Sequence, residues 1–320
     1  MKERIPMDQQ QYRQIPPPAT ESYGKRLWHL WGPIVMKWAI SFGVTMAAVA
    51  AYSFTYMSTH YETTMGAAQS EEQMANLYIQ IMEGFLRYTT LVEGAAALVT
   101  IPVMLILFHR DRIKEKLKGI VPNRKAPLWK YSAEILMALA VSLGLNNLIM
   151  IGNLSAVSQE YTETMEAFYS APLILQILCL AILIPISEEL IFRGLLYKRL
   201  RERGTFIQAA LYSAVVFGLL HMNLVQMLYA FFLGLMLAYI YEKYGSIKAP
   251  IAAHMAMNLL SVLATEYRLF EWLGEDIMRI GIVTVVCAAV ASTMFVLIQR
   301  IDEKPDIPGP SGENEHLAAV

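Results

Sequence analysis

Charged residues are scarce in this chain of 320 residues: Asp, Glu, Lys and Arg make up 17% of it, whereas 56% is hydrophobic. Soluble domains carry nearer a quarter charged residues. The mean hydropathy is +0.40, and the apolar residues gather in runs of about 20, the length that crosses the hydrocarbon of a bilayer. This composition excludes an ordinary soluble protein and predicts an all-α fold, a polytopic bundle of membrane helices.

An excess of positive charge and a cysteine framework are also missing. The net charge of −1 argues against nucleic acid as a partner. The two cysteines, Cys179 and Cys287, both lie in apolar runs and have neither metal-site nor disulfide spacing. We therefore expect them to be small core residues.

About eight apolar segments are predicted to cross the membrane. Lys and Arg collect in alternate loops, including 109–130, 198–203 and 243–248, whereas the intervening loops are acidic or nearly uncharged. By the positive-inside rule, both termini are then cytoplasmic. The predicted spans run over about 33–57, 88–108, 131–151, 171–203, 206–221, 224–241, 247–265 and 280–298.

Three ionisable residues lie close together inside the fourth apolar segment. They are Glu188, Glu189 and Arg193, and each would cost about 2.5–3.5 kcal/mol at the centre of a membrane helix. Glu189 and Arg193 are four residues apart and share a helix face, so they are predicted to form an ion pair. Glu188 points about 100° away from Glu189 and is left without a partner in its own helix.

Two later apolar segments carry further polar side chains. His221 ends the fifth segment, and His254 and Asn258 stand one turn apart in the seventh, facing the same way. A single such residue is commonly explained by hydrogen-bonded packing between helices. Three sites on nearby helices, all with residue types used in catalysis, favour a functional site instead.

The residue types suggest hydrolysis by an activated water molecule. A carboxylate in a low-dielectric cavity has a raised pKa, which suits a general base, and a His–Asn pair offers two donors to a developing oxyanion. No serine or cysteine has a plausible neighbouring base, which disfavours a covalent nucleophile. Zinc remains open: His221, His254 and Glu188 could hold it with a water in the fourth position, although the chain has no His-Glu-x-x-His helix.

The ordered series Glu-Glu-x-x-x-Arg, Phe-x-x-x-His and His-x-x-x-Asn resembles the CPBP family of intramembrane endopeptidases (CAAX proteases and bacteriocin-processing, or Abi, proteins). The resemblance covers roughly residues 170–265. It implies that Glu188 activates the water with His221 beside it, and that His254 and Asn258 stabilise the oxyanion or, in a metalloprotease, that His254 is a ligand. Glu189 and Arg193 would be structural or would orient the substrate.

With this resemblance the chain divides into four parts: a flexible cytoplasmic tail (1–26), N-terminal transmembrane helices (27–165), a CPBP-like catalytic core (166–300) and a disordered cytoplasmic tail (301–320). We expect a multi-pass protein of the plasma membrane whose partners are lipids and a membrane-associated peptide substrate. The substrate would be of the CAAX type or of the bacteriocin or leader type. The alternatives are a proton- or ion-coupled transporter and a non-catalytic immunity or scaffold protein on the same fold.

Overall fold

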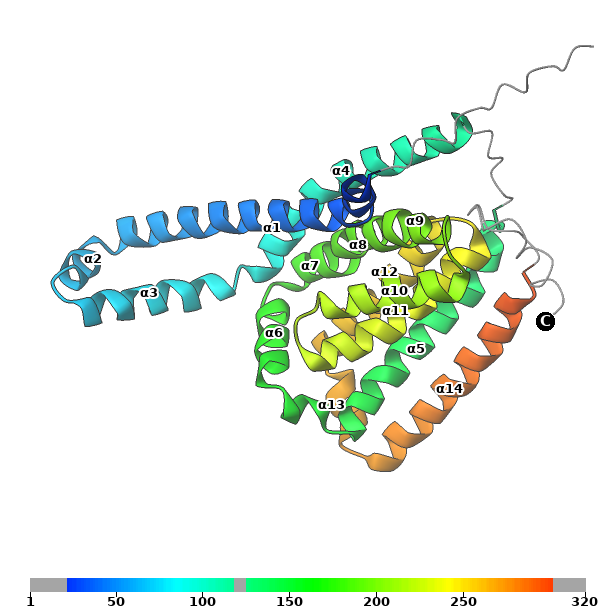
Figure 1. Ribbon diagram of the computed structural model, residues 1–320. Helices are drawn as coiled ribbons and strands as arrows, with labels where there is room; N and C mark the ends of the chain where they lie inside the picture. Colours follow the sequence, from blue (N-terminus) through cyan, green and yellow to red (C-terminus); the bar gives the residue numbers. More distant parts are fainter. Residues whose placement is uncertain (1–21, 118–124, 302–320) are drawn as a thin grey trace, which may run out of the picture.

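The computed structural model describes residues 22–117 and 125–301, and within these ranges it contains helices and no strand. The predicted all-α membrane bundle is therefore confirmed (Figure 1). The α-helices are α1 (Tyr23–Thr59), α2 (Tyr61–Ala67), α3 (Glu71–Leu86), α4 (Thr89–Leu117), α5 (Tyr131–Ile151), α6 (Gln159–Tyr169), α7 (Leu173–Gln176), α8 (Ile184–Glu189), α9 (Lys198–Arg201), α10 (Phe206–Leu219), α11 (Leu224–Tyr244), α12 (Lys248–Glu266), α13 (Leu269–Gly274) and α14 (Ile277–Gln299). Short 3₁₀ turns, η1 (Leu128–Lys130) and η2 (Leu154–Val157), flank α5, and two π-helical segments, η3 (Ile177–Leu183) and η4 (Leu190–Tyr197), flank α8.

Within the described residues, six helical segments are long and apolar enough to cross a membrane. They are Tyr23–Thr59, Thr89–Leu117, Leu128–Ile151, Leu173–Arg201, Leu224–Tyr244 and Ile277–Gln299. Helices α10 and α12 occupy the expected fifth and seventh positions. However, α10 has only 14 residues, and the polar residues of α12 lower its hydropathy. The total of eight spans and the cytoplasmic placement of the termini remain predictions.

The first helix is longer than the sequence predicts. It begins at Tyr23, inside the expected tail 1–26, and its 37 residues make it about 55 Å long. Its second half leaves the bundle and pairs with α3, forming a hairpin that projects to one side (Figure 1). The rest of the tail lies outside the described residues.

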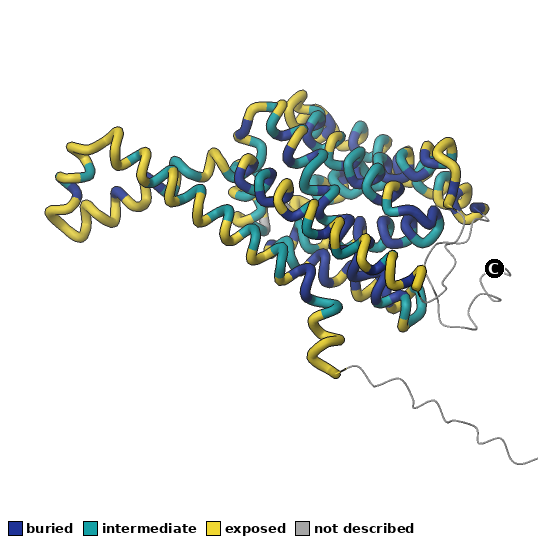
Figure 2. The backbone as a smooth tube through the Cα atoms, turned by 90° about the horizontal axis from the view of Figure 1, so that it is seen from above, coloured by how far each residue is buried: buried dark blue, intermediate teal, exposed yellow. Residues whose placement is uncertain are grey.

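Two segments predicted as polar loops are helical because their polar residues are spaced along one helix face. Leu77 and Ile81 of α3 are four residues apart and pack on Ala67, against Tyr52 of α1. Figure 2 shows that most of this hairpin is exposed, whereas buried residues concentrate in the bundle. Helix α6, in the acidic loop after α5, begins at a Ser158 side chain that accepts the Tyr161 N–H.

Large apolar side chains lie exposed on the outer helices, as expected where lipid replaces protein as the neighbour. Trp38, Phe42 and Phe54 on α1 and Val285 on α14 are examples. The interior is formed by the central segment Leu173–Arg201, the antiparallel pair α10 and α11, and the packing of α5 on α12 and α14. In Figure 1 the labels of α10, α11 and α12 lie below this central segment, α7 to α9.

The central segment changes its helical pitch around Pro185. Proline has no N–H and its ring clashes with the preceding turn of an α-helix. Here α8 starts with Pro185 in its first turn, and the wider π-helical segments η3 and η4 lie on either side. Single π turns of this kind are frequent at functional sites, and Glu188 and Glu189 lie directly between these two.

One end of the bundle is tied together by buried ion pairs, which we call the basal ionic cluster. Its members are Asp111, Glu115, Lys198, Arg199, Arg201 and Glu242. The distances are 2.5 Å for Lys198–Glu115, 2.7 Å for Arg199–Asp111 and 3.1 Å for Arg201–Glu242. Arg199 also donates to the His29 carbonyl near the start of α1. The cluster thus joins α1, α4, α9 and α11 at the end of the bundle where the basic residues gather.

Candidate active site

Glu189 and Arg193 form the predicted ion pair, and both side chains are completely buried. Arg193 Nη1 lies 2.9 Å from Glu189 Oε1. Arg193 Nη2 donates to the Gly234 carbonyl of α11 at 3.0 Å, and its guanidinium carbon is 4.7 Å from the centre of the Phe217 ring. A buried arginine is tolerated because a carboxylate, a carbonyl and an aromatic face surround it. The pair fixes the central segment against α10 and α11.

The same carboxylate oxygen of Glu189 also holds His254, which comes from α12. His254 Nδ1 is 2.9 Å from Glu189 Oε1. A carboxylate in this position only accepts, so Nδ1 carries the hydrogen. The other ring nitrogen, Nε2, is then directed to the neighbouring carboxylate and lies 3.9 Å from Glu188 Oε2. Glu188, which has no partner in its own helix, thus has a histidine from another helix beside it.

His221 reaches the same region through Phe217. Its Nδ1 lies 2.9 Å from the Phe217 carbonyl and donates to it, so Nε2 of the neutral ring is an acceptor. The Phe217 ring meets His221 and His254 edge-on, with centroid distances of 5.0 Å and 6.1 Å. His221 follows the end of α10 and is half-buried.

The turn after α10 holds the backbone of His221. Met222 adopts a left-handed conformation with φ 66°, and the Asn223 N–H donates to the His221 carbonyl at 2.8 Å. Asn223 also caps α11, since its side-chain oxygen accepts the Gln226 N–H at 2.9 Å. The end of α10 and the start of α11 thus fix the backbone position of His221.

Two glycines allow α10 and α11 to approach closely. A Cβ at Gly234 would lie 3.1 Å from the Ala214 Cα and 3.3 Å from the Phe217 ring, and one at Gly218 would lie 2.7 Å from the Met227 carbonyl. A larger residue at either position would push α10, and Phe217 with it, away from α11. Gly234 is not among the site residues predicted from the sequence, although a glycine inside a helical pattern can indicate close packing.

Asn258 lies one turn beyond His254 on α12 and is half-buried. Its Nδ2 donates to the Leu180 carbonyl of η3 at 2.8 Å. The structure therefore brings Glu188, Glu189 and His254 together, with Asn258 one turn along α12. His221 lies against Phe217, whose ring also contacts His254.

The proposed zinc ligands do not form a complete set in this arrangement. Within the described residues, no group of three or more His, Cys, Asp or Glu side chains is placed to hold a metal ion. Glu188 and His254 face one another, and the bond from Glu189 to His254 is of the kind that orients metal-binding histidines. His221 does not complete the trio, so three-residue ligation does not fit the geometry.

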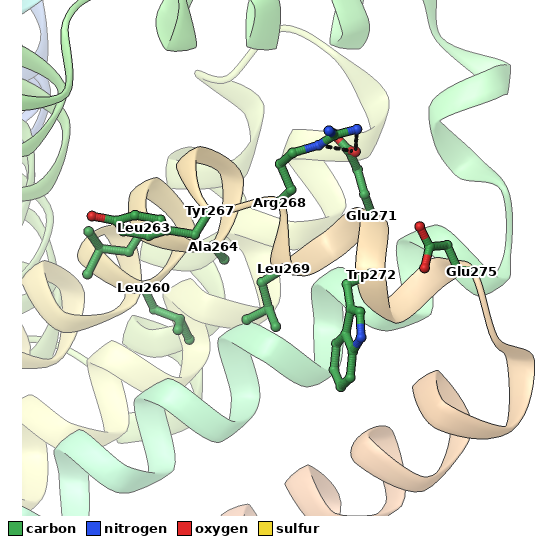
Figure 3. Close-up of a pocket in the computed structure, with 9 residues that line it drawn as sticks. All are labelled: Leu260, Leu263, Ala264, Tyr267, Arg268, Leu269, Glu271, Trp272 and Glu275. Atoms are coloured by element: carbon green, nitrogen blue, oxygen red, sulfur yellow. Dashed lines mark hydrogen bonds and ion pairs between the residues drawn. The ribbon is translucent and has the colours of Figure 1, made fainter.

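A cavity of about 630 Å³ lies at the end of α12, against α13, and none of the predicted site residues lines it (Figure 3). Arg268 and Glu271 pair at its rim. Its lining residues are Leu260, Leu263, Ala264, Tyr267, Arg268, Leu269, Glu271, Trp272 and Glu275. The cavity begins at Leu260, at the opposite end of α12 from Lys248, and is distinct from the carboxylate–histidine centre.

Part of the chain is similar in sequence to known proteins. Residues 170–260 match the family model described as type II CAAX prenyl endopeptidase Rce1-like. The chain is also 33% identical over 106 residues to a Bacillus subtilis (strain 168) protein named "Putative membrane peptidase YdiL". That match covers 33% of this chain and 43% of the relative, so the aligned part is less than half of either protein. No solved structure matches the chain significantly.

Proposed function

We propose, because residues 170–260 match the family model of Rce1-like type II CAAX prenyl endopeptidases, that this multi-pass membrane protein is an intramembrane endopeptidase. The observation that carries the proposal is the approach of Glu188 Oε2 to His254 Nε2 at 3.9 Å, with the other nitrogen of His254 held by Glu189. A half-buried carboxylate, a half-buried imidazole and a buried imidazole among apolar helices can activate a water and polarise a carbonyl.

In this mechanism Glu188 is the general base. The water donates one hydrogen to Glu188 and the other to Nε2 of His221, which is an acceptor because Nδ1 donates to the Phe217 carbonyl. The water oxygen attacks the peptide carbonyl carbon while its proton moves to Glu188. Glu188 then gives this proton to the amide nitrogen and the C–N bond breaks. The second water hydrogen stays on the new carboxyl group, so an amine and a carboxylic acid leave.

The developing oxyanion is stabilised from α12. His254 is held by its Nδ1–H bond to Glu189, so its Nε2 faces the reacting group. Asn258 contributes the amide hydrogen that Leu180 does not use. Donors held in place before the reaction are worth about 10²–10³-fold each. Glu189 and Arg193 act as positioning residues, since they hold His254 and the central segment.

The substrate we propose is a membrane-associated peptide, with a CAAX-type C-terminal peptide as the first candidate because that is the substrate class in the family description. Leader-type or bacteriocin-type peptides are the second candidate. The membrane we propose is the plasma membrane. No step of this mechanism is assigned to a metal ion.

The test is cleavage of membrane-anchored peptides by purified protein in lipid, comparing Glu188→Gln with the control Glu93→Gln on α4. We expect Glu188→Gln to lower kcat at least 10²-fold, the usual contribution of a general base, with unchanged thermal unfolding. Full cleavage by Glu188→Gln would remove Glu188 as the base. Absence of cleavage by the unmodified protein, together with proton-coupled solute uptake in vesicles, would favour the transporter alternative.

A further inference from the structure

The Leu180 carbonyl has no donor within its own helix. In an α-helix it would accept from the Ile184 N–H, but that group donates to the Cys179 carbonyl, in the π register. In the π register Leu180 would accept from residue 185, which is Pro185 and has no N–H. The proline thus leaves one carbonyl of the central segment without a backbone donor.

Asn258 supplies the missing donor from another helix. Its Nδ2 lies 2.8 Å from the Leu180 oxygen, across a sequence separation of 78 residues. Because a carbonyl oxygen only accepts, this contact also decides which end of the carboxamide faces Leu180. One amide hydrogen is used, and the carboxamide is held in a single orientation one turn from His254.

We propose that Pro185 is a positioning residue that acts through the Leu180 carbonyl to orient the Asn258 carboxamide. An amide held by one hydrogen bond presents its second N–H in a fixed direction, as a preorganised oxyanion donor requires. With any other residue at 185, a new N–H could satisfy Leu180 and release Asn258. The inference extends the proposed function and rests on it only for the catalytic consequence.

The stability part of the test does not require activity. We compare thermal unfolding of Pro185→Ala, Asn258→Ala and the double variant in the full-length protein in lipid. Asn258→Ala leaves the Leu180 carbonyl unsatisfied and should lower the melting temperature. Pro185→Ala provides a new backbone N–H donor for the Leu180 carbonyl. The melting temperature of the double variant should therefore return most of the way to that of the unmodified protein. If the two substitutions instead lower the melting temperature additively, the inference is overturned, whatever the protein catalyses.

The kinetic part uses the same three variants and a cleavable peptide. Pro185→Ala should lower kcat by up to about tenfold, with KM unchanged and without loss of thermal stability. This is less than the loss of a whole oxyanion donor, because the Asn258 carboxamide stays in place and loses only the hydrogen bond that orients it. In the Asn258→Ala background, Pro185→Ala should lower kcat no further. A further loss would show that Pro185 acts elsewhere and would overturn the positioning role.

A matched control is Pro102→Ala, which removes another proline from inside a helix, α4. It should leave kcat unchanged and should show no coupling to Asn258→Ala. If Glu188→Gln cleaves normally, the proposed mechanism fails, but the stability cycle still decides whether Pro185 and Asn258 are coupled. Equal coupling of Pro102 and Pro185 to Asn258 would contradict the inference.

Discussion

Oε1 of Glu189 lies 2.9 Å from His254 Nδ1 and, at the same distance, from Arg193 Nη1. One oxygen therefore serves both a buried cation and a histidine of the candidate active site. The ion pair predicted within one helix is also the support of a residue on α12. Stability and catalysis should consequently respond together when this carboxylate is changed.

We predict that Glu189→Gln destabilises the protein by about 3–5 kcal/mol, because it leaves the Arg193 guanidinium buried without an opposite charge. Cleavage per folded molecule should also fall, because Gln can present an N–H to His254 and so permit the other tautomer. The measurement is thermal unfolding in lipid together with kcat. Glu271→Gln, at the exposed pair with Arg268, is the control and should leave the melting temperature unchanged.

A second prediction concerns the close contact of α10 and α11. Gly234→Val should cost about 1–3 kcal/mol by overpacking, since its Cβ would start 3.3 Å from the Phe217 ring. Displacement of Phe217 should also lower kcat by moving His221. Gly281→Val on α14 is the control, because a Cβ there meets nothing within 4 Å. An unaltered kcat in Gly234→Val would show that this contact does not position the site.

A third prediction concerns metal removal. Because Glu188 and His254 face one another without a third metal-binding side chain grouped with them in the described part of the chain, we expect cleavage to persist after exhaustive chelation. The measurement is kcat with metal content determined on the same sample. Loss of activity on chelation, with recovery on adding one equivalent of zinc, would contradict the metal-independent mechanism. A chelated Glu188→Gln sample controls for contaminating peptidases.

A fourth prediction separates the basal ionic cluster from the site. Arg199→Met breaks a pair that is buried on both sides, and it should lower stability by about 3–5 kcal/mol. The kcat of the remaining folded protein should stay within about twofold, because the cluster contains no site residue. Lys114→Met, an exposed partner of the same Asp111 at 3.8 Å, should change neither quantity. A large drop in kcat for Arg199→Met would indicate coupling between the two regions.

The sequence by itself determined the class of fold and the approximate positions of the long apolar helices, and it predicted the candidate site residues. Long apolar runs predict helices because every backbone N–H and C=O group in lipid must be hydrogen-bonded within its own helix. The pairing of Glu189 with Arg193 can be predicted from the sequence because residues four apart share a helix face. Polar side chains in such runs stand out because burying them is costly.

Only the tertiary structure decided how residues on different helices meet. The contacts of His254 with both carboxylates, of Arg193 with the Gly234 carbonyl, and of Asn258 with the Leu180 carbonyl each join separate helices. Helical periodicity gives the direction of a side chain about its own axis but neither the partner nor the depth. The partner of a side chain and its depth depend on how closely two helices approach and on where a proline changes the helical pitch. Both are determined by the packing of the whole bundle.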